Sequence, residues 1–426
     1  MKRAGVLILL IALVVCATGQ ETIRIMQYNL LNYGNSTDYC TSTNNNVNVK
    51  NGYIRTVFKE INPDILTVCE FGTSQTLPES FLSNVINVDG VHSWRQCRGN
   101  NNAGSSLINC CFYDSEKFTL ISHVSAQTYI RDIDVFTFAV NSATRVGDTT
   151  KLNCVVAHLK AGSGSENEGK RKIMAQGTMS YLEHFMGGEN VLIMGDFNLY
   201  SSDEDAYQTF TDASSYPDSY FVDPVGDVGV GDWNNNYQYR NYHTQSTNSS
   251  GNGCITGGGM DDRFDFILMS NTINEGYDNI YYVDDSYEAF GNDGEHFNGS
   301  INYPANTSVS PEAADALAGN SDHLPVTMQL WVRNTVNVDE NDSVIYFALQ
   351  PNPASHSTKM NLKMEKNGVV SVRVYDIVGH LVKEFSHNCE NGGNSIDISL
   401  DGMKKGLYLI SAASDEFFCT SKLIVE

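Results

Sequence analysis

The segment VLIMGDFN at residues 191–198 decides the fold of the larger part of this chain. Its apolar run from Val191 to Met194 predicts a buried strand, and Gly195 allows the chain to turn where that strand ends. Asp196 and Asn198 then point the same way, two residues apart. An acid and an amide at this spacing are suited to orient a water molecule and to brace a phosphorus centre. The alternative is an ordinary turn formed by Asp and Asn.

Strand-like and helix-like segments alternate on both sides of this motif, throughout residues 22–332. Alternation of this kind predicts an α/β domain with an internal sheet. Two stretches, 212–260 and 284–320, are rich in Gly, Asn, Asp and Ser, and we expect them to form long surface loops. The expected strands are 22–28, 65–69, 152–159, 190–194 and 264–269, and the expected helices are 54–61, which Pro63 stops, and 166–185.

Polar side chains stand at the ends of three further strand-like segments. Asn29 ends the first strand, Glu70 follows the apolar run 65–69, and His158 ends the segment 152–159, with Lys160 two residues later. A carboxylate is the ligand that Mg²⁺ prefers, and a histidine can protonate a leaving group or contact a phosphate oxygen. Taken singly, each residue has a structural alternative: Asn29 as a turn former, Glu70 as a solvated strand end and His158 as a core histidine.

The last candidates are Asp265, in the strand-like segment 264–269, and Asp322 and His323, in the string SDHLPV at 321–326. Asp322 offers a metal ligand and His323 a general base or a phosphate contact. Asp265 is suited to hold the His323 ring in one tautomer, as carboxylates commonly do for catalytic imidazoles. For the string SDH alone, the alternative is a helix cap or a loop.

Taken in order along the chain, these groups resemble the endonuclease/exonuclease/phosphatase superfamily, which includes pancreatic-type deoxyribonucleases and bacterial sphingomyelinases. The resemblance covers residues 22–332, and GDFN and SDHLPV are its most specific strings. It implies a four-layer α/β sandwich, in which two packed mixed sheets are flanked by helices. It also implies hydrolysis of a phosphate ester with a divalent metal ion, Mg²⁺ or else Mn²⁺ or Ca²⁺. The two long loops match no particular branch, so the substrate stays open.

The resemblance further implies a role for each candidate. Glu70 is implied as the metal ligand, with Asn29 and Asp322 nearby. Asp196 positions or activates the attacking water. His323, paired with Asp265, acts as general base or stabilises the pentacovalent centre, and the superfamily leaves open which group is the base. The implied contacts to the substrate phosphate are Asn198, His158 and Lys160.

For His158 the residues alone give no clear acidic partner, and Tyr113 and Glu168 are the candidates.

The chain is strongly acidic, with 27 Lys and Arg against 50 Asp and Glu and a formal net charge of −23. Hydrophobic residues make up 41%, which excludes wholesale disorder. The charge argues against a general polyanion binder, because phosphate contacts need positive charge. The basic cluster near a motif is Lys160, Lys170, Arg171 and Lys172, which could hold a polyanion or form a solvated helix face.

The N-terminus has the pattern of a secretory signal peptide, which we place at residues 1–20. A basic start at Lys2 and Arg3 precedes an apolar run over 5–15 and the small residues 17–19. A membrane anchor is the alternative, and no other stretch is suited to span a bilayer. Removal of the leader leaves nine cysteines, so at least one thiol is unpaired within the chain. Cys69 and Cys154 lie in apolar runs and are expected to be buried.

A polar linker is expected at residues 333–343, followed by a small all-β sandwich at 344–426. The strings QPNPA at 350–354, VYDIVG at 374–379 and GLY at 406–408 resemble the C-terminal sorting domain of the type IX secretion system. This resemblance implies export by that secretion machinery, with the enzyme released or anchored at the cell surface. The alternative is a carbohydrate-binding or adhesive sandwich.

Together these patterns predict a secreted, metal-dependent phosphodiesterase at residues 21–332, with an extracellular endonuclease as the leading hypothesis. A sphingomyelinase or phospholipase C-like enzyme and a phosphomonoesterase are the enzyme alternatives. A non-catalytic surface protein is the third. The oligomeric state and the pairing of the cysteines stay open.

Overall fold

The computed structural model describes residues 20–145, 148–226, 230–333, 344–364, 366–377, 379–414 and 418–426. The chain forms two compact units, Met1–Thr335 and Val336–Glu426, called here the first and the second unit. Residues 1–19 of the predicted leader and residues 334–343 of the predicted linker lie outside the described residues. In the part of the chain that is described, no helix is both long enough and apolar enough to cross a membrane.

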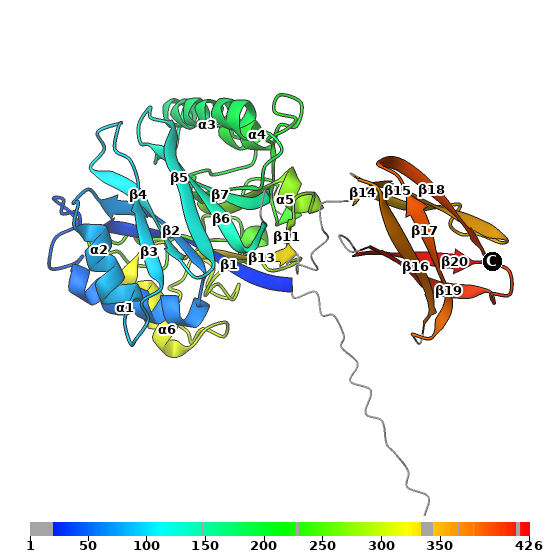
Figure 1. The fold of residues 1–426 in the computed structure, drawn as a ribbon. Helices are drawn as coiled ribbons and strands as arrows, with labels where there is room; N and C mark the ends of the chain where they lie inside the picture. The colour runs from blue at the N-terminus through cyan, green and yellow to red at the C-terminus, as the bar shows by residue number, and fades with distance from the viewer. Residues whose placement is uncertain are drawn as a thin grey trace, which may run out of the picture. The chain divides into compact units, whose positions relative to one another are not determined.

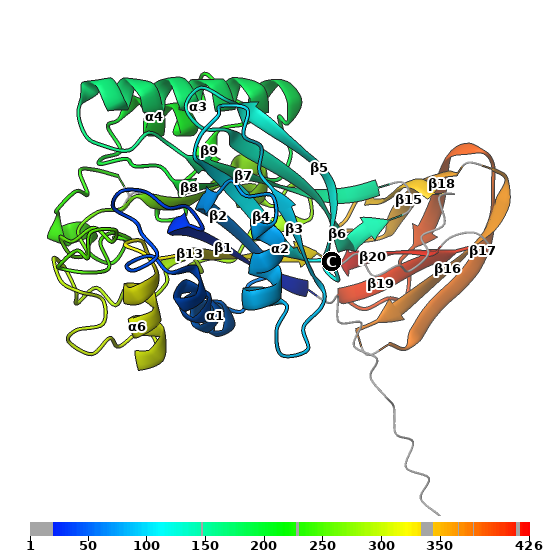
Figure 2. The same ribbon diagram turned by 90° about the vertical axis from the view of Figure 1, so that its left-hand side faces the viewer.

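One sheet of the first unit has the strand order β11-β13-β1-β2-β4-β3, with β12 also paired to β13. Its central strand β1 runs parallel to β2 and antiparallel to β13. Helices α1 and α6 and the short helix α2, which continues into a π-helical turn at Leu82–Ile86, cover one face (Figures 1 and 2). The elements are β1 (Gln20–Tyr33), α1 (Val47–Ile61), β2 (Ile65–Gly72), α2 (Leu77–Phe81), β3 (Trp94–Arg98), β4 (Leu107–Asp114), β11 (Ile280–Tyr282), β12 (Glu288–Ala289), α6 (Pro311–Asn320) and β13 (Val326–Arg333).

The other sheet has the order β5-β6-β7-β8-β10-β9, and β7 and β8 run parallel. Helices α3 and α4 lie over its outer face, as Figure 2 shows. The elements are β5 (Phe118–Gln127), β6 (Ile133–Arg145), β7 (Asp148–His158), α3 (Ser165–Phe185), β8 (Val191–Asp196), α4 (Asp205–Thr211), β9 (Phe221–Val222), β10 (Asp265–Ser270) and α5 (Asn271–Glu275), with a 3-10 turn at Tyr237–Tyr239.

The central strands are buried on both faces, which makes the unit a four-layer sandwich. In β8, Leu192 and Met194 enter the core between the sheets, whereas Ile193 packs under the helices of the outer layer. In β1, Ile25 faces the inner core and Met26 the helical layer. Successive residues of a strand point to opposite faces, so a continuous apolar run is what such a strand requires. The predicted α/β sandwich is therefore confirmed.

Part of this architecture was not predicted from the sequence. The strands β3 to β6 were not predicted: β5 and β6 carry several Ser, Thr and Asn residues, and β3 is short and polar. The stretch 284–320 was predicted as a loop, but it contains α6, which begins at Pro311 with the Ser310 hydroxyl accepting a hydrogen bond from the backbone of Ala313. That prediction was wrong because an alanine-rich helix of ten residues has little amphipathic contrast.

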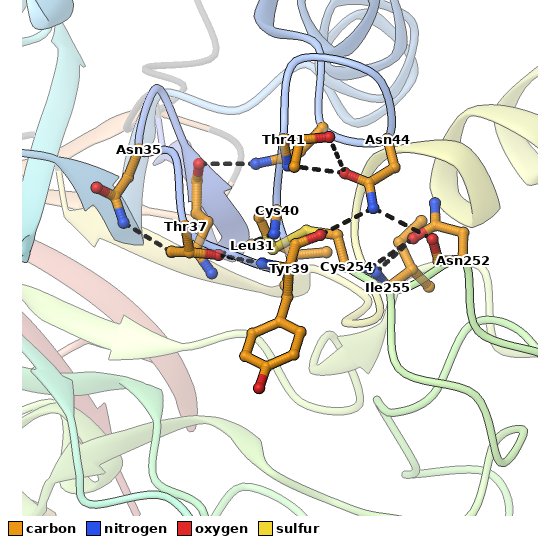
Figure 3. Close-up of a disulfide and its surroundings, with 12 residues drawn as sticks. Leu31, Asn35, Thr37, Tyr39, Cys40, Thr41, Asn44, Asn252, Cys254 and Ile255 are labelled. Carbon is orange, nitrogen blue, oxygen red and sulfur yellow. Dashed lines mark hydrogen bonds between the residues drawn. A yellow bond between two sulfur atoms is a disulfide. The ribbon is translucent and has the colours of Figure 1, made fainter.

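One disulfide, Cys40–Cys254, joins the loop after β1 to the loop before β10 (Figure 3). Beside it, the Asn44 side chain donates hydrogen bonds to the backbone oxygens of Tyr39 and Asn252, at 2.9 and 3.2 Å, so the two loops are also joined by polar contacts. Among the cysteine side chains that the structure describes, the free thiols are Cys69, Cys97, Cys110, Cys111, Cys154 and Cys389. Cys69 and Cys154 are fully buried, as predicted.

The second unit is a small all-β sandwich, as predicted. One sheet has the order β14-β15-β18 and the other β17-β16-β19-β20. Alternate residues such as Val370, Val372 and Val374 of β16 fill its core. The strands are β14 (Val344–Gln350), which was not predicted, β15 (Ser357–Met364), β16 (Gly368–Asp376), β17 (Leu381–Cys389), β18 (Gly392–Ser399), β19 (Gly406–Ala413) and β20 (Phe418–Val425).

A histidine–carboxylate pair in the first unit predicts a pH-dependent stability. His123 Nε2 lies 2.8 Å from Asp134 Oδ1, and the ring stacks on Phe136. Burial alone lowers the pKa of His123, but the Asp134 carboxylate outweighs it and raises the pKa from 6.5 to about 9. A raised histidine pKa stabilises the fold below the unfolded value and loses this effect as the pH rises through the folded value.

We therefore expect the free energy of unfolding to fall by roughly 1–3 kcal/mol between pH 6.5 and 9.5 through this pair. Urea denaturation of the wild type and of His123→Gln across this range measures the difference. Parallel pH curves for the two proteins would contradict the prediction.

Candidate active site

Strand pairing brings the predicted polar residues together at one end of the two sheets. In the second sheet, Asp196 at the end of β8 pairs in register with His158 of β7 on one side and with Asp265 of β10 on the other. In the first sheet, Asn29 of β1 stands beside Cys69, the residue before Glu70 on β2. The side chains of Asn29 and Asp196 then meet across the sheets, at 3.0 Å.

Gly195 is required because two backbones approach closely at this point. It has φ +146°, and a Cβ atom placed on it would lie 1.7 Å from the carbonyl oxygen of Ala157 on β7. The residue lies inside β8, before the strand ends. The prediction that Gly195 turns the chain is therefore wrong, since its absent side chain instead allows β8 to bring Asp196 beside His158.

Asn29 links the two acidic groups of the site. Its Nδ2 donates to Glu70 Oε1 at 3.2 Å and to Asp196 Oδ2 at 3.0 Å, while its Oδ1 accepts from the backbone N–H of Leu31. The second oxygen of Glu70 accepts from the backbone and the side chain of Asn32, at 3.0 and 3.3 Å. The amide of Asn29 thus holds two carboxylates close together, and its oxygen is already engaged.

His158 completes a set of three metal-binding side chains. Its Nε2 lies 3.5 Å from Asp196 Oδ2 and 3.9 Å from Glu70 Oε1. One ligand atom from each of these three residues lies within 4.8 Å of the others. Neither predicted partner of His158 lies beside it, since Tyr113 packs in the core between the sheets and Glu168 lines a surface groove. Its acidic neighbours are Asp196 and Glu70 instead.

The His158 ring is neutral at physiological pH. Its burial, the neighbouring Arg131 and the His323 ring lower the pKa of His158 well below its usual value. Its Nδ1 is buried and has no hydrogen-bond partner among the described residues. A neutral ring keeps a lone pair, which a metal ion or a proton donor can use.

Asp265 and His323 form the predicted pair, with 2.7 Å between Asp265 Oδ2 and His323 Nδ1. The hydroxyl of Thr244 donates to the same carboxylate oxygen at 2.7 Å, so Asp265 is fixed from two sides. His323 Nε2 faces Asp196 Oδ2 at 3.8 Å and the side-chain nitrogen of Gln245 at 2.8 Å.

The carboxylates decide the charge of His323. Burial lowers the pKa of His323, but Asp265 and Asp196 outweigh burial and raise it well above its usual value. The Gln245 amide by itself suits a neutral ring, which accepts at Nε2. Because two carboxylates act on a largely dry site, their effect exceeds that of one amide dipole, and the ring is cationic.

Asp196 is the carboxyl group whose charge is least favourable. Burial has the largest effect on the pKa of Asp196, and the charges of Asp265 and Glu70 add to it. Although His323 acts in the opposite direction, the pKa of Asp196 rises to about 7. Several acids therefore share a site that is short of positive charge. Two carboxylates and one imidazole at these distances fit a divalent cation, which would relieve that imbalance.

The remaining predicted residues lie at the edge of this cluster. Asn198 has φ +52°, and its backbone N–H donates to Asp196 Oδ1 at 3.0 Å. Asp322 Oδ1 lies 4.0 Å from His323 Nε2, and its other oxygen accepts from the backbone of Thr256 at 3.1 Å. Lys160 donates to the backbone of its neighbour Ala161, and among the described residues no hydrogen bond or ion pair joins its side chain to the cluster.

Sequence reasoning missed the side chains that hold these groups in place. Asn32 comes from the last residues of β1, Thr244 and Gln245 come from a loop, and the buried Lys50 comes from α1, where it donates to backbone oxygens of β1. Burial lowers the pKa of Lys50 to about 7. Nothing in the sequence singles out Lys50 as a buried residue, because surface lysines have the same local pattern.

Solved structures similar to this chain have low sequence identity to it. A truncated Caenorhabditis elegans TDP2 is 16% identical, with 73% of this chain and 97% of that chain covered and a TM-score of 0.44. The human Nocturnin catalytic domain is 16% identical, with 72% and 94% covered and a TM-score of 0.44. An endonuclease/exonuclease/phosphatase from Beutenbergia cavernae is 12% identical, with 95% and 99% covered and a TM-score of 0.41. At these scores none of them supports an argument about activity.

The search of curated proteins gave no match. The second unit has a clear counterpart, because residues 348–426 match the family model described as the secretion system C-terminal sorting domain, as the strings at 350–354, 374–379 and 406–408 predicted.

Proposed function

We propose that the first unit is a divalent-metal-dependent phosphoric ester hydrolase that acts on phosphodiesters. The observation that carries the proposal is the register of Asp196 between His158 and Asp265, with Glu70 and Asn29 facing it from the other sheet. Acids, a neutral imidazole and a cationic imidazole then surround one point. This is the set of groups that hydrolysis of a phosphate ester needs.

Glu70, Asp196 and His158 are the residues that would hold the metal ion. The ion, when bound, supplies positive charge that stabilises the negative charge of the transition state. Mg²⁺ suits the two carboxylates, and Mn²⁺ also accepts the imidazole nitrogen. Asn29 and Asp322 were expected as further ligands. Asn29 is better placed to space the carboxylates, while the unpartnered Asp322 Oδ1 stays available.

The other side chains divide the chemical work. Asp196 orients the attacking water and accepts its proton. The cationic His323, fixed by Asp265, donates to the oxygens of the pentacovalent centre. Asn198 contacts the phosphate beside it. The phosphate contact and proton donation that the resemblance implies for His158 apply only to an arrangement in which Glu70 and Asp196 hold the metal ion without it.

Charge distribution bears on which diester is cut. Three of the four residues of the predicted basic cluster are paired with acids: Arg171 is fully buried and paired with Glu204, and Lys170 and Lys172 are paired with Glu166 and Asp205. A surface groove of about 720 Å³, lined in part by Tyr200, carries the further acids Glu168, Asp203 and Asp232 beside the paired Glu204 and Asp205. A long polyanion is repelled by such a surface.

An extracellular nuclease remains the leading prediction for residues 21–332, and these charges favour a second candidate, hydrolysis of a small or zwitterionic diester. The segment 277–290 is rich in tyrosine, and exposed aromatic rings there would favour a lipid substrate. Tyr277 is exposed, but Tyr282 and Tyr287 pack against the core between the sheets.

The test compares bis-p-nitrophenyl phosphate with p-nitrophenyl phosphate, using the purified full chain with Mg²⁺, with Mn²⁺ and with EDTA. We expect metal-dependent release from the diester that EDTA abolishes and added metal restores. Release from the monoester alone would move the assignment to a phosphomonoesterase. Absence of release from both, together with no metal binding by calorimetry, would leave the non-catalytic surface protein.

We further propose that the chain is exported through type IX secretion, to the medium or to the cell surface. The match of residues 348–426 to the sorting-domain family supports this. The partner of the second unit is then the secretion machinery. A chain truncated after Thr335 is the matching test, because it should stay inside the producing cell.

A further inference from the structure

We propose that Lys50, a residue of α1 outside the strand-end motifs, is a positioning residue for the metal site through the backbone of the β1 bulge. This inference rests on the proposed function, since it concerns the same site. It adds a residue to which the sequence motifs assign no role.

The bulge is a local break in the pairing of β1 with β2, between Asn29 and Tyr33. Leu31 and Asn32 adopt φ values of +44° and +49°, a conformation that side chains other than glycine seldom take. Two consecutive residues of this kind persist only where the surroundings hold them. The bulge therefore depends on contacts from outside β1.

The N–H groups of the bulge face the site. Leu31 N–H donates to Asn29 Oδ1 at 2.9 Å, and Asn32 N–H donates to Glu70 Oε2 at 3.0 Å. These two bonds orient Asn29, which spaces the carboxylates, and Glu70, which is the implied ligand. The conformation of two backbone units thus sets the positions of both side chains.

The carbonyl groups of the same bulge face Lys50. The Lys50 ammonium donates to the backbone oxygens of Leu30 and Leu31 at 2.7 and 2.9 Å and to Asn45 Oδ1 at 2.9 Å. These three acceptors match the three hydrogens of an ammonium group. The Asn45 side chain in turn donates to the oxygen of Asn32 at 2.9 Å, so three successive carbonyl groups are held.

Lys50 is only 2% exposed and has no carboxylate within ion-pairing distance among the described residues. A buried cation that contacts only neutral oxygens gains little from an ion pair, and its burial is costly. Lys50 instead supplies fixed hydrogen-bond donors, which hold the carbonyl groups of the bulge in their orientation. The link therefore runs from Lys50, through the bulge, to Asn29 and Glu70.

The test measures Mn²⁺ binding to the full chain by calorimetry, with activity as a separate readout. For Lys50→Met we expect the Mn²⁺ dissociation constant to rise about 10–100-fold, the usual cost of losing a residue that orients a ligand. In the diester assay the half-saturating Mn²⁺ concentration should rise likewise, while the rate at saturating Mn²⁺ stays near that of the wild type. Lys59→Met is the matched control, because Lys59 lies on the same helix, is exposed and pairs with Asp89.

The outcomes separate this inference from the proposed function. A folded Lys50→Met protein, judged by near-ultraviolet circular dichroism, with the wild-type dissociation constant would overturn the inference, and so would a wild-type chain that binds no Mn²⁺. Weakened Mn²⁺ binding in a chain that hydrolyses neither ester would support the inference and contradict the proposed function. If Lys50→Met does not fold, Asn45→Ala decides, with weaker Mn²⁺ binding supporting the inference and unchanged binding overturning it.

Discussion

Asp196→Asn is expected to lower the rate of bis-p-nitrophenyl phosphate hydrolysis by about 10³-fold or more, while the protein stays at least as stable as the wild type. The substitution keeps the size of the side chain but removes the group that accepts the proton of water and takes part in the metal set. It also removes an acid that burial disfavours. Because its folded pKa is about 7 against 3.8 in the reference state, ionised Asp196 costs stability at neutral and higher pH.

Rate and unfolding temperature should therefore change in opposite directions, as they do when an active site is held at the expense of stability. Steady-state kinetics and thermal unfolding of the same preparations measure both. Asp203→Asn is the control, since Asp203 is exposed in the neighbouring groove and should leave both quantities unchanged. An Asp196→Asn enzyme with more than a tenth of the wild-type rate would rule out its proposed role.

His323→Ala should lower the same rate by about 10²–10³-fold, the range seen when a donor to a developing negative charge is removed. Asp265→Asn should give a smaller loss with a distinct pH dependence. Asp265 raises the pKa of His323, so the wild-type ring stays cationic through neutral pH. Without that carboxylate the pKa falls, and activity that needs the cation is lost at lower pH than in the wild type.

A pH–rate profile of Asp265→Asn at saturating substrate shows this shift directly. His184→Ala is the control, because His184 lies in the last turn of α3 against Phe185, and among the described residues no hydrogen bond or ion pair joins its side chain to the site. Should the Asp265→Asn profile keep the wild-type shape, His323 would not act as the cation. Should its acid limb instead move to lower pH, the general-base alternative for His323 would gain support.

Local patterns predicted the strands that carry the site, because those strands are buried on both faces. Continuous apolar runs such as 191–194 leave little choice of structure, and the polar residue that ends each run must lie at a sheet edge. The string GDFN therefore located Asp196 at the end of β8, and SDHLPV located His323 just before β13. The pairing of His158 with Asp196 follows from a parallel register that one sequence does not specify.

The side chains that hold the site residues in place could not be predicted in the same way. Lys50 has the local pattern of any helical lysine, and Gln245 lies in a loop whose course depends on contacts far along the chain. The sequence left open whether the basic cluster at 170–172 holds a polyanion or forms a helix face, for a related reason. Arg171 and Lys172 are paired with Glu204 and Asp205, which come from the segment after β8, and Lys170 is paired with Glu166. Tertiary contacts, rather than composition, decide whether such charges reach a ligand.

The Cys40–Cys254 disulfide makes the stability of the loops around the site depend on the redox conditions of the compartment that holds the protein. It spans 214 residues, and for a closed loop of that length the chain-entropy effect is about 5 kcal/mol. Thiols stay reduced in the cytosol and pair outside it. The covalent bond between the loop after the bulge and the loop that holds Asp322 through Thr256 is then expected to form only in an oxidising compartment, where it adds to the hydrogen bonds from Asn44. If the first unit is exported and hydrolyses phosphate esters, as proposed, its site is less firmly held among the esters of the producing cell than among those outside.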